Sequence, residues 1–222
     1  MKFRKLHALT VAAGAALALC SGAASAVETN FSGFTNGCFA VSPSTTCVPV
    51  SNSSGTQTAT LGGLTYQMSN FNAGTAGGFL GLGAVGQKLP AFNVNNLGSF
   101  TLSGLPFTYG GNHFSLMVTF VDPTGILPSN HPIFNDTLFG TVASDGHGGA
   151  LVDFDNTPQM FTFPDGSFTF SVNDVSVLAG ETIALSGTIR AQVTAVPEPE
   201  TYALFMAGLG ALGFMARRRR KS

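Results

Sequence analysis

Alternation of apolar and polar residues is strongest in the second half of the chain. Phe161-Thr162-Phe163 and Phe168-Thr169-Phe170-Ser171-Val172 place phenylalanine or valine at every second position, with Ser or Thr between them. Because successive side chains of a strand point to opposite faces, this period of two predicts strands with one buried and one solvated face. Such strands are typical of antiparallel sheets.

Similar runs recur along the chain between segments rich in turn-forming residues. Asp145–Gly149 and Pro164–Ser167 are each expected to join two antiparallel strands. The glycine-rich stretch Gly77–Gly86 lacks the helix and lysine of a phosphate-binding loop, so it is interpreted as an irregular β segment. The pattern predicts an all-β domain, either an antiparallel β-sandwich or a jelly-roll-like fold. The expected strands are Thr58–Met68, Gly98–Ser103, Phe114–Val121, Thr137–Ser144, Ala150–Asp155, Gln159–Phe163, Phe168–Asp174 and Thr182–Val193.

The first 26 residues have the pattern of a secretory signal peptide. Three elements follow one another: the cations Lys2, Arg4 and Lys5, the apolar stretch Ala8–Cys20, and the small-x-small site Ala24-Ser25-Ala26. Signal peptidase is therefore expected to cut after Ala26. Lipidation of Cys20 is an alternative, but Leu19 stands where a lipoprotein precursor needs a small residue.

The other end of the sequence has a turn, an apolar run and a cationic stop. Pro197 and Pro199 hold the chain extended around Glu198, and the apolar run Tyr202–Ala216 follows. The run ends at the basic residues Arg217, Arg218, Arg219, Arg220 and Lys221. At ~1.5 Å per residue a helix over this run spans about 22 Å, less than the ~30 Å hydrocarbon core. It is predicted to be a short transmembrane helix whose basic end stays in the cytoplasm.

In order and composition, this segment resembles the PEP-CTERM sorting tail of Gram-negative bacteria. The resemblance covers Val196–Lys221 and implies recognition and cleavage at Pro197-Glu198-Pro199 by exosortase, a membrane transpeptidase. It further implies an exported protein, held in the inner membrane as a precursor and then released to the cell surface or extracellular matrix. The alternative is a permanent single-pass anchor, in which Gly208 and Gly213 allow close helix packing.

The region between the two addresses, Val27–Val196, is an acidic domain of about 170 residues. Its basic residues are Lys88 and Arg190, and two cations against nine acidic residues give a net charge of −7. Such a domain does not neutralise nucleic-acid phosphates, so the composition excludes nucleic acid as a partner.

Cys38 and Cys47 are the two cysteines of this region. An exported protein meets an oxidising compartment, so these cysteines are expected to form a disulfide that closes a short loop. A metal role is disfavoured because two cysteines supply only half of a typical zinc ligand set, and no histidine lies near them.

Local catalytic motifs are absent from the sequence. There is no Gly-x-Ser-x-Gly, His-Glu-x-x-His or Ser-x-x-Lys, and His113, His131 and His147 lie in loop-like contexts. The protein is therefore predicted to be non-catalytic, with no catalytic residue assigned. A glycan platform of exposed tryptophans is excluded because the chain has none, and Tyr66 and Tyr109 fit either a core or a sheet edge.

A weak calcium site is the one metal candidate. Asp153 and Asp155 share one face of a strand end, and Asp145 lies in the turn that begins the same hairpin. Carboxylate oxygens suit Ca²⁺, but no recognisable loop completes a shell of six to eight ligands. The expectation is solvated carboxylates and no cofactor.

Three classes of function follow from these observations. The first is a non-catalytic surface or matrix protein, sorted by exosortase and associated with exopolysaccharide in a biofilm, as the resemblance implies. The second is a glycan- or calcium-binding module, and the third is a secreted hydrolase. The sorting tail and the absent catalytic motifs favour the first.

Overall fold

A computed structural model describes residues 28–42, 44–53, 57–86, 88, 95–193, 205–213 and 217. These residues form fifteen β-strands in three sheets, and every strand pairing is antiparallel. The all-β prediction is therefore confirmed. Residues 205–213 and 217 are helical, and no helix among the described residues is long and apolar enough to cross a membrane.

The large sheet has the order β13 (Val175–Leu178), β10 (Gly148–Phe154), β9 (Ile133–Val142), β8 (His113–Asp122), β1 (Asn30–Ala40) and β4 (Asn70–Gly74), and β7 (Phe107–Thr108) pairs with β9. A second sheet, called the β12 sheet, has the order β11 (Gln159–Phe163), β12 (Gly166–Val172), β15 (Gly187–Val193) and β5 (Phe79–Leu82). The third, the β6 sheet, has the order β14 (Thr182–Ala184), β6 (Ser99–Leu102), β3 (Leu64–Gln67) and β2 (Thr58–Leu61).

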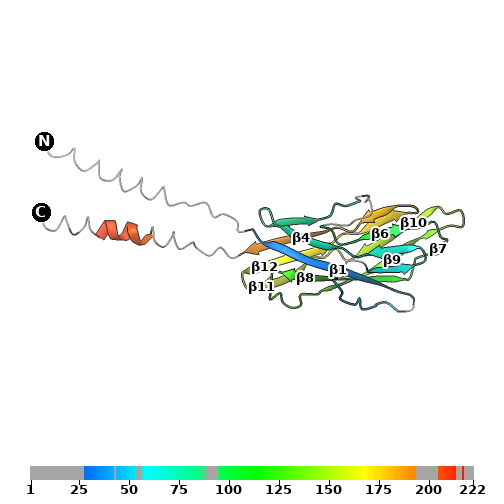
Figure 1. Ribbon diagram of the computed structural model, residues 1–222, viewed down its shortest axis with the longest axis horizontal. Coiled ribbons are helices and arrows are strands. Elements are labelled where there is room, and N and C mark those ends of the chain that lie inside the picture. The colour runs from blue at the N-terminus through cyan, green and yellow to red at the C-terminus, as the bar shows by residue number, and fades with distance from the viewer. Residues whose placement is uncertain are drawn as a thin grey trace, which may run out of the picture. The chain divides into compact units, whose positions relative to one another are not determined.

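Aromatic contacts join the sheets into two layers around one core. At one end of the large sheet, Phe31 and Phe120 pack against Phe168 of the β12 sheet, with ring centroids 4.9 and 5.2 Å apart. At the other end, Phe114 packs against Tyr66 and Phe100 of the β6 sheet at 4.9 and 5.0 Å. The large sheet is thus one layer and the two smaller sheets form the other, with β12 and β6 toward opposite ends of the domain (Figure 1).

Strand β1 crosses the middle of this domain (Figure 1), and its glycines make room for the rings. A Cβ on Gly37 would lie 2.4 Å from the Phe114 ring and 2.7 Å from the Tyr66 ring. A Cβ on Gly33 would lie 2.6 Å from the Phe71 ring. Glycine within a strand often marks such a close approach.

Several expected strands have different bounds in the structure. Thr58–Met68 was predicted as one strand and is a hairpin of β2 and β3, because Gly62 and Gly63 adopt φ values of +53° and +89° that turn the chain. Thr182–Val193 was likewise predicted as one strand, and it divides into β14 and β15, which belong to different sheets. Strands β1, β4, β7 and β13 were not predicted.

Candidate functional site

The sequence signals at both ends lie largely outside the described residues. This holds for the cleavage site Ala24 and Ala26, for Pro197, Glu198 and Pro199, and for Arg218, Arg219, Arg220 and Lys221. Within the apolar run, residues 205–213 are helical and exposed, as is Arg217 of the basic stop. The predicted span and the cleavage sites therefore stay predictions.

Cys38 and Cys47 form a disulfide in the structure, with their Cα atoms 6.1 Å apart. Cys38 belongs to β1, so the bond ties the irregular segment after this strand back to the large sheet. Asn36, only 1% exposed, adds a second tie because its side-chain amide exchanges two hydrogen bonds with the backbone of Asn52, at 3.1 and 3.2 Å. The segment between β1 and β2 is thus held at two points.

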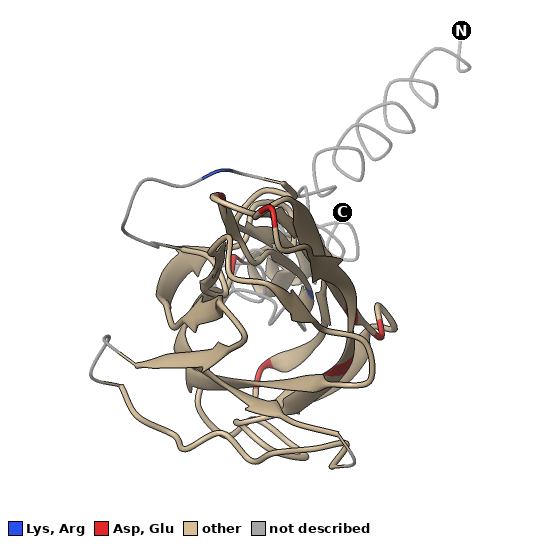
Figure 2. Cartoon of the chain, turned by 90° about the vertical axis from the view of Figure 1, so that its right-hand side faces the viewer, with Lys and Arg blue, Asp and Glu red and all other residues tan. Residues whose placement is uncertain are grey.

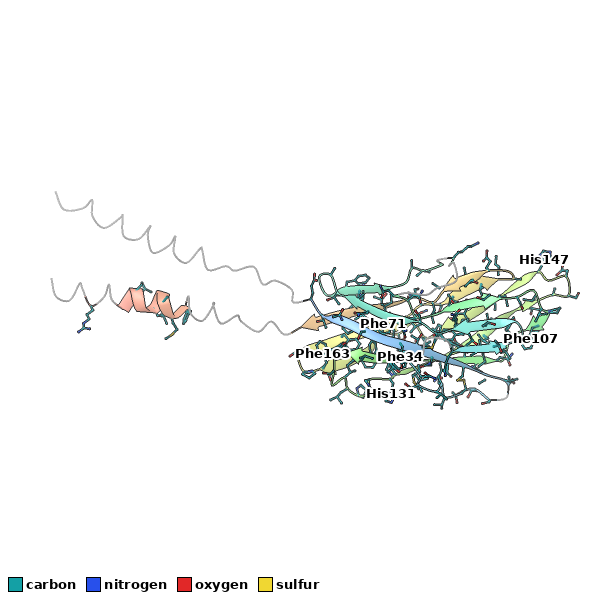
Figure 3. All side chains as sticks on the ribbon, viewed as in Figure 1. Phe34, Phe71, Phe107, His131, His147 and Phe163 are labelled. Carbon is teal, nitrogen blue, oxygen red and sulfur yellow. A yellow bond between two sulfur atoms is a disulfide. The ribbon has the colours of Figure 1, made fainter. Side chains whose placement is uncertain are left out.

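The three histidines of the domain belong to separate elements. His113 begins β8 and its Nδ1 lies 2.9 Å from the backbone oxygen of Asp136, whereas His131 lies in the loop before β9 and contacts the Asn130 amide oxygen at 2.8 Å. His147 lies in the turn between β9 and β10. Figure 3 shows His131 and His147 well apart on the domain, so the fold does not bring these two together into one site.

The three aspartates of the calcium candidate are not brought together either. Asp145 lies in the turn before β10, and its Oδ1 accepts a hydrogen bond from the His147 backbone N–H at 3.0 Å. Asp153 lies near the other end of β10 and Asp155 just beyond it, so roughly 20 Å of strand separates them from Asp145. Asp145 therefore lies apart from the other two candidates, because an extended strand keeps its two ends apart. Among the described residues, no three His, Cys, Asp or Glu side chains form a metal-binding group.

Asp155 makes a local turn. Its Oδ1 accepts a hydrogen bond from the Thr157 backbone N–H at 3.0 Å, and hydrogen bonding to Thr157 lowers the pKa of this exposed carboxyl. Asp174 lies close by in the fold, where its carboxylate accepts hydrogen bonds from the Phe154 backbone N–H and the Asn156 side-chain amide. These acids therefore act as local acceptors at the ends of strands.

Both tyrosines of the domain belong to the core. Tyr66 is 1% exposed, and its hydroxyl donates to Thr35 Oγ1 or Leu97 O, each at 2.7 Å, while burial raises its pKa. Tyr109 is fully buried as a residue and its hydroxyl donates to the Gly62 carbonyl at 2.5 Å. Neither ring is presented on the surface as a sugar-stacking platform.

A buried carboxyl, Asp136, was missed in the sequence. It lies on β9 directly opposite Phe114 of β8 and Phe154 of β10, and it is 4% exposed. Its Oδ1 accepts a hydrogen bond from the Phe114 backbone N–H at 2.8 Å, and its Oδ2 has no hydrogen-bond partner. Burial raises the pKa of Asp136 to about 8, against the opposing effect of the Phe114 hydrogen bond, and Asp153 and Asp174 add to the rise. The signal was present, because Phe134, Asp136 and Leu138 share one parity of an alternating strand.

The outer face of the β12 sheet carries a cross-strand row that was also missed. Met160, Thr169, Arg190 and Phe79 are consecutive cross-strand partners on β11, β12, β15 and β5. Their neighbours along each strand point inward and are mostly buried, so the row faces solvent. The Arg190 guanidinium carbon lies 5.5 Å from the centre of the Phe79 ring, in a cation–π contact.

Comparison with known proteins identifies one part of the chain. No curated protein and no solved structure matches the sequence. A family model, the PEP-CTERM protein-sorting motif, matches residues 195–220, which contain Pro197-Glu198-Pro199, the apolar run and the arginines. The predicted resemblance of the tail is thereby confirmed: residues 195–220 of this chain carry a PEP-CTERM protein-sorting motif.

Proposed function

We propose that this chain is the precursor of an exported cell-surface or extracellular-matrix protein that exosortase sorts through its C-terminal tail. The match of residues 195–220 to the PEP-CTERM sorting motif carries this proposal. The acidic, antiparallel β domain is the part that is exported, and the tail is its sorting signal. The low positive charge of the domain agrees with a role away from nucleic acid: Lys and Arg are sparse on the ribbon (Figure 2).

Two cleavages mature the precursor. Signal peptidase cuts after Ala26, and the apolar run Tyr202–Ala216 then holds the chain in the inner membrane while the basic residues that follow stay in the cytoplasm. Exosortase recognises and cuts the tail at Pro197-Glu198-Pro199. A span of this length suits a transient anchor, since it is shorter than the hydrocarbon core that it crosses.

The exported domain acts without catalysis and associates with extracellular polysaccharide. Two observations support a non-catalytic role: the sequence has no local catalytic motif, and His131 and His147 lie on separate parts of the domain. No cofactor is needed for it. A secreted hydrolase is the competing function, and screening the exported protein on polysaccharide, ester and peptide substrates distinguishes the two.

The sorting step is tested by replacing Pro197, Glu198 and Pro199 together with alanine in a host that has exosortase. Fractionation of these cells is expected to find the variant in the inner membrane, while the unmodified protein reaches the surface. Alanine replacement of the three exposed residues Ser44, Thr45 and Thr46, in the segment after β1, is the matched control and should leave sorting unchanged. Surface delivery of the tail variant at the unmodified level would refute the proposal.

A further inference from the structure

The β12 sheet presents an open outer face made of small hydroxyl side chains around one cation. The central row is Met160, Thr169, Arg190 and Phe79, as defined above. On one side of it lie Thr162, Ser167 and Gln192, which are partners across the same three strands, and on the other side lie Ser171, Thr188 and Gly81. With strands ~4.8 Å apart, the central row is about 14 Å long. Within the described residues, this face carries no Asp or Glu.

Arg190 differs from the other cation of the domain in two ways: it has no ion-pair partner among the described residues, and its guanidinium packs on an aromatic ring. It is exposed and makes no ion pair among the described residues, whereas the other cation of the domain, Lys88, pairs with Glu181. Its guanidinium rests over the Phe79 ring, which limits the positions that the group samples. The acid nearest in sequence to this face is Asp165, which lies in the β11–β12 turn two residues before Ser167. The face thus offers an oriented positive charge, and none of the nine acids that give the domain its net charge of −7 lies among the residues of this face.

Resting on the proposed association with polysaccharide, we propose that this face binds a carboxylate-bearing polysaccharide, with Arg190 holding the carboxylate of a uronic acid unit. A guanidinium binds a carboxylate through two parallel hydrogen bonds, which a neutral sugar does not accept. A uronic acid unit presents one carboxylate flanked by hydroxyls, which matches one arginine set among Thr and Ser side chains.

The other members of the row have distinct parts in this site. Thr169, next to Arg190, hydrogen-bonds sugar hydroxyls, and the exposed Met160 side chain gives apolar contact to a sugar ring. Phe79 is a positioning residue because it acts through the guanidinium it supports. The site therefore depends on the charge of Arg190 and on the ring beneath it.

The test measures binding of polygalacturonate to the full chain purified in detergent, with carboxyl-reduced polygalacturonate as the neutral control glycan. Arg190→Ala is expected to weaken binding of the acidic glycan by about tenfold or more, since charged hydrogen bonds are lost. Lys88→Ala removes the same charge elsewhere and should bind as the unmodified protein does. Phe79→Leu is expected to weaken binding several-fold, and Phe79→Tyr, which keeps the ring, should restore it.

Folding and sorting are followed in the same variants. Equal melting temperatures show that Arg190→Ala leaves the fold intact, and cell fractionation shows whether it is exported like the unmodified protein. Unchanged binding in Arg190→Ala, equal losses in Lys88→Ala, or equal affinity for the reduced glycan would each overturn the site. An exported and processed protein that ignores polygalacturonate would refute this site while leaving the sorting proposal in place.

Discussion

The tail and the β domain of this protein differ in what their function requires: the tail requires a linear sequence motif, and the domain requires tertiary contacts. Residues 195–220 match a sorting motif as a string, and a motif of this kind needs only the order of its proline, apolar and basic parts. The domain works through contacts between residues distant in sequence, such as Phe31 with Phe168 and Asn36 with Asn52. We infer that the sorting motif functions when attached to another protein, whatever the fold of the domain before it. The stability of the β domain, in contrast, depends on individual contacts.

The largest effect is expected when the tail is fused to another protein, which tests whether the sorting motif functions without the β domain. Residues 195–222 attached to an unrelated secreted reporter should direct it through exosortase, because the signal is linear. The readout is an all-or-none loss of the tail, detected as a mass change of the reporter. The same graft with Pro197, Glu198 and Pro199 replaced by alanine is the control, and a reporter retained intact in both cases would show that the domain itself is required.

The next largest effect concerns the buried carboxyl of Asp136. Its pKa in the folded protein is raised to about 8, so between roughly pH 4 and 8 the folded state keeps a proton that the unfolded state has released. Stability therefore falls as pH rises through this window, by about 1.4 kcal/mol per pH unit, or ~3 kcal/mol between pH 5 and 7. Denaturant unfolding of the full chain in detergent at several pH values measures this slope.

Asp136→Asn removes the titrating group, so the fall should be present in the unmodified protein and absent from the variant. Asp165→Asn, at an exposed turn, is the matched control and should leave the pH profile as it was. Parallel pH profiles for the unmodified protein and Asp136→Asn would show that Asp136 is ionised in the fold at neutral pH.

The disulfide is expected to contribute somewhat less. Cys38→Ser with Cys47→Ser should lower the free energy of unfolding by about 2–3 kcal/mol, because a short closed loop is released in the unfolded chain. Local loosening of the segment after β1 is expected before global unfolding, since Asn36 still holds this segment. Non-reducing peptide mapping of the exported protein checks the bond itself, and free thiols on both cysteines would contradict it.

The smallest of these effects tests the ring packing under β1. Gly37→Ala places a methyl group 2.4 Å from the Phe114 ring and should destabilise the domain by about 2 kcal/mol through overpacking. Gly74→Ala on β4 is the matched control, since nothing lies within 4 Å of its added Cβ. Both variants should still lose the tail, and a processing defect confined to Gly37→Ala would mean that exosortase requires the intact fold.

The features that could be predicted from the sequence are those determined by residues close together in the chain. Alternation at Phe161–Phe163 and Phe168–Val172 predicted β11 and β12, and the tail was identified from its own residues. Strand β1 was missed because Asn36 and two glycines give it the composition of a turn, although the glycines are needed by rings from Phe71, Phe114 and Tyr66. Distant contacts of this kind leave little trace in a local pattern.

The candidate sites show the same limit. The disulfide could be predicted because an exported protein meets an oxidising compartment and the domain has only two cysteines, which allow one pairing. The structure contains this disulfide. Asp145, Asp153 and Asp155 were weak calcium candidates because they lie near one another in sequence, but the extended strand β10 separates Asp145 from Asp155 in space. Arg190 and Phe79 lie far apart along the chain, so only the pairing of β15 with β5 brings them together.

The central claim, that both ends are addresses removed during export, is tested most directly by the intact mass of the protein extracted from the surface of a host with exosortase. We predict a mature chain that begins at Val27 and lacks Arg217–Lys221, with a mass consistent with cleavage at Pro197-Glu198-Pro199. A surface protein whose mass still includes Lys221 would contradict this account.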